Sequence, residues 1–278
     1  MLTVRAETTE TPEISPEISS FEFALSRTEQ DLAKTMEASK KFSNALARLH
    51  KSVSTGNLHD LEKQFETAQK LFEPLKQQLQ SSRKAWQFDA ETYLESGQYE
   101  KDLMEAAHES GLNMIQKDSH VLNCYPSVLK LSPKEQILKI GKKRSKHLRP
   151  KVVAQIMKEA QKKPPKLNDN AFLEQLFKAY QRIVKSRGKS IDETNPVVSL
   201  KEIYKYMNPL PWQAKEYSED EFARDLYLLE KSGITATEEN YAVDFHASTM
   251  AKNLSSTLIT ASEDGSERIY AGIRFRKK

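Results

Sequence analysis

Cationic side chains are concentrated in residues 138–166, which hold eleven Lys or Arg residues and one acid, Glu159. Ammonium and guanidinium groups at this density bind polyanions, because each phosphate that they neutralise releases counterions. We expect residues 142–151 to form a turn and the start of a helix, where backbone N–H groups also face phosphates. The pattern predicts contact with a nucleic-acid backbone. A solvated surface, or a docking patch for an acidic protein segment such as the chain's own N-terminal third, is the alternative.

Groups that could perform catalysis or bind a metal are scattered along the chain. The motif SRGKS at residues 186–190 ends like a phosphate-binding P-loop, but Ile183 stands where that motif requires its first glycine. His120 and Cys124 have no second cysteine and no His-x-x-x-His pair nearby, so we expect no zinc site. We predict no catalytic residue, metal, cofactor or small-molecule substrate. An enzyme of unfamiliar design would be revealed by tight uptake of Mg²⁺, Zn²⁺ or ATP.

The net charge of +4 over 278 residues hides a strong segregation of charge. Residues 1–111 carry 13 basic and 19 acidic side chains, net −6, whereas residues 138–166 are net +10. Such segregation creates a local field that attracts polyanions. With one cysteine, no charged-then-apolar leader and no long apolar run, the sequence favours a cytoplasmic protein without a membrane span. In a eukaryote, KKRSK could direct the protein to the nucleus.

The N-terminal third is predicted to be helical after a disordered tail. Residues 1–18 are rich in Glu, Thr and Pro and poor in large apolar groups. Residues 19–111 are expected to form an antiparallel helical hairpin or coiled coil, with a reversal at STGN, residues 54–57, and a following helix. The second helix carries a regular apolar seam, which we assign to the hairpin core or to a protein interface such as a homodimer. The interface candidates are Leu58, Leu61, Phe65, Phe72, Leu75 and Leu79.

The middle of the chain is predicted to be a small basic α/β module at residues 112–187. Short apolar runs between turn residues, in LNMIQKDSHVLNCYPSVLKLSP and EQILKIG, indicate three or four short strands. Pro150 suits the first position of a helix. A second helix with a wide apolar stripe runs from about Asn170 and ends at Gly188. Residues 188–196, GKSIDETNP, are expected to be a linker.

Residues 197–278 contain a short strand, a helix, a Pro-rich connection, a helix that starts at a Ser218-Glu221 capping box, and a terminal hairpin with an Asp264-Gly265 turn. This order resembles a winged-helix domain, over less than a third of the chain. The resemblance implies that the third helix reads DNA and that the hairpin is a wing. However, residues 219–231 contain five acids and two bases, so they would repel a duplex and suit a protein partner better.

The terminal hairpin offers a second basic surface. Strand alternation places Arg268, Tyr270, Arg274 and Arg276 on one exposed face and the apolar residues 269, 271, 273 and 275 on the other. This face could grip a phosphate backbone, or it could be a charged edge that prevents aggregation. The insertion at residues 235–254 departs from the compact winged-helix pattern and leaves a different small α+β domain open.

The sequence as a whole predicts a mostly α protein with small β elements. We predict a non-enzymatic subunit that binds DNA or RNA through phosphates and joins an assembly whose catalytic activity, as an ATPase or nuclease, lies in another subunit. The alternative is a pure protein–protein adaptor without nucleic-acid contact. The candidate nucleic-acid-binding residues are Lys139, Lys142, Lys143, Arg144, Lys146, His147, Arg149, Lys151, Lys158, Lys162, Lys163, Arg268, Arg274 and Arg276.

Overall fold

The computed structural model describes residues 21–86, 88–246 and 257–278. The chain divides into two compact units, Met1–Ala90 and Glu91–Lys278, each of which is described by itself. The predicted tail at residues 1–18 lies outside the described residues. The predicted fold class is confirmed: the protein is mostly helical with antiparallel sheets, and it contains a long helix pair, a central sheet and a C-terminal mixed α/β region.

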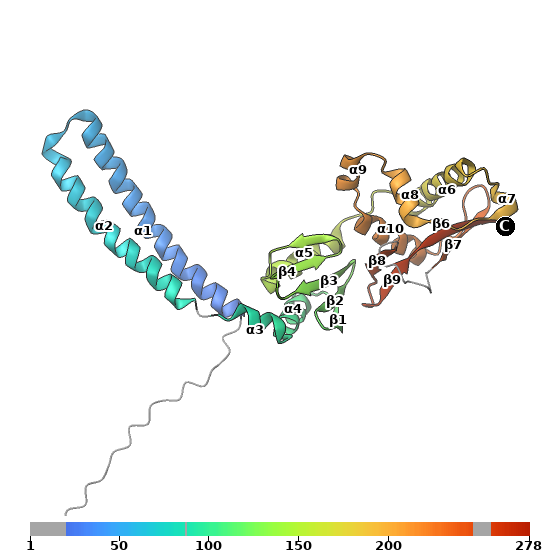
Figure 1. The fold of residues 1–278 in the computed structure, drawn as a ribbon, viewed down its shortest axis with the longest axis horizontal. Coiled ribbons are helices and arrows are strands. Elements are labelled where there is room, and N and C mark those ends of the chain that lie inside the picture. The colour runs from blue at the N-terminus through green and yellow to red at the C-terminus, as the bar shows by residue number, and fades with distance from the viewer. Residues whose placement is uncertain (1–20, 87, 247–256) are drawn as a thin grey trace, which may run out of the picture. The chain divides into compact units, whose positions relative to one another are not determined.

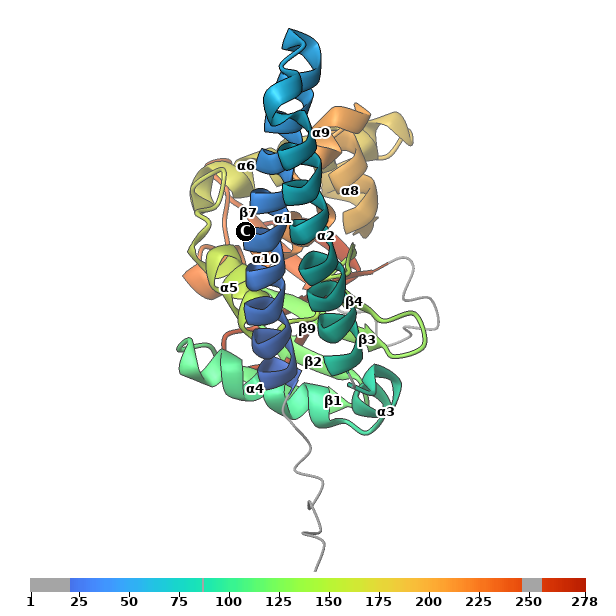
Figure 2. The same ribbon diagram turned by 90° about the vertical axis from the view of Figure 1, so that its left-hand side faces the viewer.

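The first unit is a helical hairpin of α1 (Phe21–Thr55) and α2 (Leu58–Ala85), which lie side by side in Figure 1 and Figure 2. Gly56 reverses the chain with a φ of 69°, a left-handed conformation that glycine adopts without strain. Asn57 then caps α2, because its side chain accepts a hydrogen bond from the backbone N–H of Asp60 at 3.3 Å. The predicted reversal at residues 54–57 is therefore confirmed.

The buried positions between the two helices hold small side chains, and the large apolar residues between them are half-buried. The residues buried in this seam are Thr35, Ala45, Ser52, Ala68 and Ser82. The predicted seam divides into two rows: Leu61 and Leu75 are half-buried within the hairpin, whereas the other row is exposed. This second row consists of Leu58, Phe65, Phe72 and Leu79. The prediction that they form one seam was wrong, because a helix pair buries one stripe per helix, and Leu61, Ala68 and Leu75 occupy the stripe of α2.

The second unit begins with α3 (Ala90–Glu95) and α4 (Gln98–Glu109). Leu103 and Ala107 of α4 are fully buried, and α4 packs against β1 (Met114–Asp118) and α5 (Pro150–Lys162). Residues 91–111 therefore belong to the central module and not to the hairpin, which corrects the predicted boundary at residue 111. Their apolar stripe is satisfied by the sheet and α5, so it does not extend the coiled coil.

The central sheet is an antiparallel meander of order β1-β2-β3-β4-β5. The remaining strands are β2 (Val121–Cys124), β3 (Ser127–Ser132), β4 (Ile137–Ile140) and β5 (Lys143–Ser145). Leu122, Leu129 and Leu138 are buried on one face of this sheet. The segment Lys143–Ser145 is thus a strand paired with β4, where the sequence predicted a turn. Its polar residues gave no strand signal, because edge pairing depends on backbone hydrogen bonds rather than on apolar side chains.

The C-terminal region combines helices with two small antiparallel sheets, one of order β6-β10-β7 and one of order β8-β9. The short strand, the helix after it and the capped helix occur in the predicted order, whereas the winged-helix resemblance stays a prediction. The helices are α6 (Asp169–Ser186), α7 (Ile191–Thr194), α8 (Leu200–Met207), α9 (Pro211–Glu216) and α10 (Glu219–Ser232). The strands are β6 (Val198–Ser199), β7 (Tyr241–His246), β8 (Leu258–Ala261), β9 (Glu267–Tyr270) and β10 (Gly272–Lys277).

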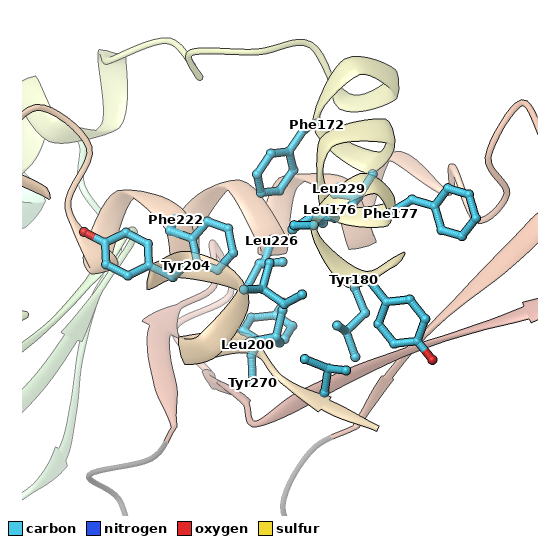
Figure 3. Close-up of a cluster of buried hydrophobic side chains, with 14 of the residues drawn as sticks. Phe172, Leu176, Phe177, Tyr180, Leu200, Tyr204, Phe222, Leu226, Leu229 and Tyr270 are labelled. Atoms are coloured by element: carbon cyan, nitrogen blue, oxygen red, sulfur yellow. The ribbon is translucent and has the colours of Figure 1, made fainter. Parts of the chain in front are cut away.

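The core of this region is formed by α6, α8 and α10 over the β6-β10-β7 sheet (Figure 3). Phe177 and Tyr180 of α6 lie 4.9 and 5.1 Å from Phe275 of β10, measured between ring centroids. Phe172 of α6 meets Phe222 of α10 at 5.7 Å. Helix α6 therefore belongs with the C-terminal core, and the predicted linker at residues 188–196 contains α7, whose Ile191 packs against that core. The predicted boundaries at 187 and 197 missed this, because a wide apolar stripe does not identify its partner.

Candidate nucleic-acid interface

The cation-rich residues 138–166, which we call the basic segment, extend over strands, a connecting segment and a helix of the central module. Lys139 lies on β4, Lys143 and Arg144 lie on β5, and Lys151 lies in the first turn of α5. Lys146 and His147 lie between β5 and α5, and the backbone N–H of His147 donates to Ser145 Oγ at 3.1 Å. Of the remaining candidates, Lys158 lies within α5, and the others lie at a turn or a helix end: Lys142, Arg149, Lys162 and Lys163.

Three of these cations are paired with carboxylates of the same chain. Lys142 forms an ion pair with Glu219, and Lys163 forms one with Glu221. Arg144 donates to Glu135 at 2.7 Å. Half or more of each of these three cationic side chains remains exposed, so the pairs reduce the local charge without burying it. The basic segment is thus less positive in the folded protein than in the sequence.

The acids that meet the segment come from the start of α10. Ser218 caps this helix as predicted, and Glu221 completes the capping box. Burial acts to raise the pKa of Glu221, but hydrogen bonds from Lys163 and Ser218 outweigh it and lower the pKa to about 2. Between these two acids, Asp220 accepts the backbone N–H of Lys142 at 2.9 Å. The N-terminus of α10 therefore binds the basic segment inside the molecule, an arrangement that the sequence did not reveal.

Three cations lie directly opposite one another on neighbouring strands of the central sheet. Lys130 of β3 is in register with Lys139 of β4, and Lys139 is in register with Arg144 of β5. All three side chains are exposed. They share the face opposite to Leu129 and Leu138, since successive residues of a strand point to opposite faces. We call Lys130, Lys139 and Arg144 the basic row.

Lys130 was missed by the sequence interpretation because it precedes the basic segment. The alternation in SVLKLS, where Lys130 stands between Leu129 and Leu131, was the available signal. Among the described residues, Lys130 and Lys139 make no ion pair, whereas Arg144 pairs with Glu135. The other candidates with no ion pair in the described part of the chain are Lys143, Lys146, His147, Lys151, Lys158 and Lys162.

The basic row borders a cavity of about 270 Å³ between the central sheet and the C-terminal region. Lys130, Lys142 and Lys201 line it together with Glu219 and Asp220. Burial, and then the neighbouring charge of Lys142, lower the pKa of Lys201. The cavity thus gathers cations from β3, the β4–β5 turn and α8, which are far apart in sequence.

The arginines of the terminal hairpin do not form one exposed strip. Arg268 lies on β9 and pairs across to β8, whereas Arg274 and Arg276 lie on β10 in the other sheet. Arg274 and Arg276 both donate to Asp244 of β7, at 2.6 and 3.2 Å. The predicted continuous ribbon was wrong, because the chain changes sheets at Ala271 and Gly272.

Tyr270 was also predicted to be exposed, and it is 4% exposed. Its hydroxyl donates to Glu230 of α10 at 2.6 Å. After Tyr270 the chain leaves β9, and a β-carbon on Gly272 would lie 2.5 Å from Val197 Cγ1 and 3.3 Å from the backbone oxygen of Val198. Glycine therefore leaves room for β10 to pair with β6, while β9 pairs with β8.

The helix that the winged-helix resemblance would assign to DNA reading is α10, and most of it is covered. Its buried residues face both the apolar core and the central module: Phe222, Ala223, Arg224, Asp225, Leu226, Tyr227 and Leu229. The guanidinium of Arg224 donates to Asp225 Oδ1 at 2.7 Å and to the backbone carbonyl of Lys163 at 3.0 Å. Its acids are thus occupied inside the unit, which agrees with the expectation that α10 does not contact a duplex.

The pair His120 and Cys124 is not arranged for nucleophilic chemistry. His120 Nδ1 lies 2.6 Å from Glu100 Oε1. Cys124 is fully buried, and burial raises the pKa of its thiol to about 12, so the thiolate is not populated at neutral pH. Across residues 21–86, 88–246 and 257–278, no three His, Cys, Asp or Glu side chains are grouped to hold a metal ion. None of the helices in these ranges is long and apolar enough to cross a membrane.

Comparisons of the chain with protein-family models, with curated proteins and with solved structures found no match.

Proposed function

We propose that this chain is a non-enzymatic assembly subunit that binds the phosphate backbone of DNA or RNA through the basic row and the cations beside it. The register of Lys130, Lys139 and Arg144 carries this proposal. Like charges directly opposite one another destabilise a sheet, and neighbouring strands lie about 4.8 Å apart. A polyanion lying across β3, β4 and β5 removes this repulsion and releases counterions.

The candidate residues differ in their expected contribution to phosphate binding, because some of them already form ion pairs within the chain. Lys143, Lys146 and Lys151 are exposed and make no ion pair among the described residues, so they extend the binding surface from the basic row to α5. Lys142, Arg144 and Lys163 contribute less, because Glu219, Glu135 and Glu221 already balance their charge. The surface reads phosphates rather than base edges, so we expect little sequence specificity.

A salt titration tests the proposal. Labelled mixed-sequence DNA and RNA are titrated with wild-type protein and with the Lys130→Gln/Lys139→Gln variant, with fluorescence anisotropy as the readout. Removing two phosphate contacts should weaken binding to all sequences alike and reduce the slope of log K against log salt by about 2. The control, Lys101→Gln/Lys178→Gln, removes two exposed lysines from α4 and α6 and should leave the slope unchanged.

A broader variant tests the basic segment as a whole. Replacing Lys142, Lys143, Arg144 and Lys146 with Glu should abolish binding. If the variants bind as tightly and as salt-dependently as wild type, the nucleic-acid role is wrong.

The runner-up function is a protein adaptor whose basic segment binds an acidic segment of a partner. The ion pairs of Lys142 with Glu219 and of Lys163 with Glu221 favour it, since they are contacts of this kind within one chain. An adaptor would bind neither DNA nor RNA at low salt, whereas the proposed subunit binds at least one of them. In both functions the helical hairpin and the C-terminal region contact other proteins, and any catalysis belongs to another subunit.

A further inference from the structure

The helical hairpin has an apolar side that the pairing of α1 with α2 leaves exposed. On α2, Leu58, Phe65, Phe72 and Leu79 recur every seven residues and are 79%, 46%, 48% and 54% exposed. On α1, Leu32, Leu46 and Val53 follow the same seven-residue spacing, with Ser39 at the remaining position, and are 42%, 43% and 58% exposed. We call these seven apolar residues the outer apolar face.

The two rows lie on the same side of the hairpin. In the heptad of each helix they occupy the position four residues after a seam residue: Leu46 follows Phe42, and Phe72 follows Ala68. Antiparallel helices are related by an approximate two-fold axis perpendicular to the plane that contains them, so equivalent heptad positions face the same side. The rings of Phe42 and Phe72 lie 5.6 Å apart, which places the α2 row beside the α1 seam.

The opposite side of the hairpin has the character of a solvated surface. The heptad position that precedes the seam on α1 is basic in four successive heptads, at Arg27, Lys34, Lys41 and Arg48. In a two-stranded coiled coil both flanking positions are commonly charged. On α2 the equivalent positions are Asp60, Thr67, Pro74 and Ser81. One side of the hairpin therefore lacks large apolar residues and suits water, whereas the other is apolar and suits a further layer of helices.

We propose that the outer apolar face binds the same face of a second copy of this chain, forming a four-helix bundle. A partner must cover two parallel rows, one on each helix, and a second hairpin presents two rows with the same seven-residue period. Such a face is self-complementary about a two-fold axis, as dimers of identical chains require. The inference rests on the proposed role of the hairpin as an assembly surface, and it specifies the partner.

The size of the face agrees with a dimer. Two Phe side chains of about 150–250 Å² each and five smaller aliphatic side chains, each roughly half exposed, offer on the order of 500–700 Å² of apolar surface. A stable protein–protein interface buries about 800 Å² on each partner, whereas the largest apolar patch of a monomer is about 300–600 Å². The outer apolar face is therefore at or above the size of the largest apolar patch of a typical monomer, and it approaches the area that one partner buries in a stable interface.

The mass of the full-length protein in solution tests the proposal. Light scattering at micromolar concentration without nucleic acid should give twice the 31.8 kDa of one chain, because the mass that it reports does not depend on shape. Leu46→Glu/Phe65→Glu places a carboxylate in each row and should halve the mass. The matched control, Asn44→Glu/Gln77→Glu, adds the same charge at exposed positions away from the face and should remain dimeric.

The outcomes separate this inference from the nucleic-acid role. A wild-type protein with the mass of one chain overturns the dimer, whether or not any variant folds. A Leu46→Glu/Phe65→Glu variant that keeps its helical circular dichroism and still has twice the mass overturns the assignment to this face. Salt-dependent binding of DNA or RNA is measured independently, and a monomeric variant should retain it with a lower apparent affinity through lost bivalency.

Discussion

The carboxylate of Asp220 occupies the space where a side chain on Gly141 would stand. A β-carbon on Gly141 would lie 2.5 Å from Asp220 Oδ2, and the same oxygen accepts the backbone N–H of Lys142 at 2.9 Å. Gly141 has a φ of 58°, in the left-handed region. This contact joins the β4–β5 turn of the central module to the first turn of α10, so it fixes the acids of α10 beside the basic segment.

Gly141→Ala should destabilise the second unit more than a comparable glycine substitution elsewhere. The left-handed backbone costs a residue with a β-carbon about 1 kcal/mol, and displacing the Asp220 carboxylate adds about 1–3 kcal/mol. The control is Gly188→Ala, where φ is 67° and no atom lies within 4 Å of the added carbon. Urea unfolding measures both. Equal losses for the two variants would mean that Asp220 does not constrain residue 141.

The ion pair of Glu221 with Lys163 should make stability depend on acid. The pKa of Glu221, about 2, lies below the ordinary value of 4.5. The carboxylate of Glu221 therefore binds a proton more tightly in the unfolded chain than in the folded chain. The stabilisation is fully present above pH of about 4.5 and is lost as the pH falls toward about 2.

Glu221→Gln should therefore reduce the free energy of unfolding by about 2 kcal/mol at neutral pH. The difference from wild type should shrink when urea unfolding is repeated at acidic pH. Glu105→Gln, at an exposed position on α4, serves as the control with little effect at either pH. A Glu221→Gln difference that is constant with pH would contradict the assignment.

Arg224 and Asp225 should behave as a coupled buried pair. Their side chains are 4% and 5% exposed, so Arg224→Met leaves an uncompensated carboxylate and should cost about 3–5 kcal/mol. Arg224→Met/Asp225→Leu removes both charges and should be more stable than Arg224→Met. A double-mutant cycle in urea measures this coupling. Additive effects would show that the two charges do not depend on each other.

Glu219→Gln should strengthen nucleic-acid binding. Glu219 balances the charge of Lys142, so its removal frees one cation for a phosphate and should raise the salt slope by about 1. Anisotropy titrations over a salt series measure the slope, with Glu105→Gln as the matched loss of one exposed acid. A Glu219→Gln variant with the wild-type slope would indicate that Lys142 lies outside the binding surface.

Elements specified by local signals were predicted well. The Ser218-Glu221 capping box, the reversal at residues 54–57 and the hairpin turn at Gly265 each depend on residues within a few positions of one another. The prediction failed for β5, because this strand forms by pairing with β4. The predicted exposure of Tyr270 was also wrong, because the face on which its side chain lies depends on where the chain passes from one sheet to the other.

The sequence by itself determined the helical periods, the apolar and cationic residue types and the crowding of positive charge in residues 138–166. The tertiary structure decided which of those charges stay unbalanced. Lys142 and Glu219 are 77 residues apart in the chain, and they meet because α10 packs beside the β4–β5 turn. It also decided that Lys130 joins the basic row and that Leu58 and Leu61 face different sides of the hairpin. Strand register and helix packing are set by contacts between distant segments, and local sequence patterns do not encode which distant segment will be the partner.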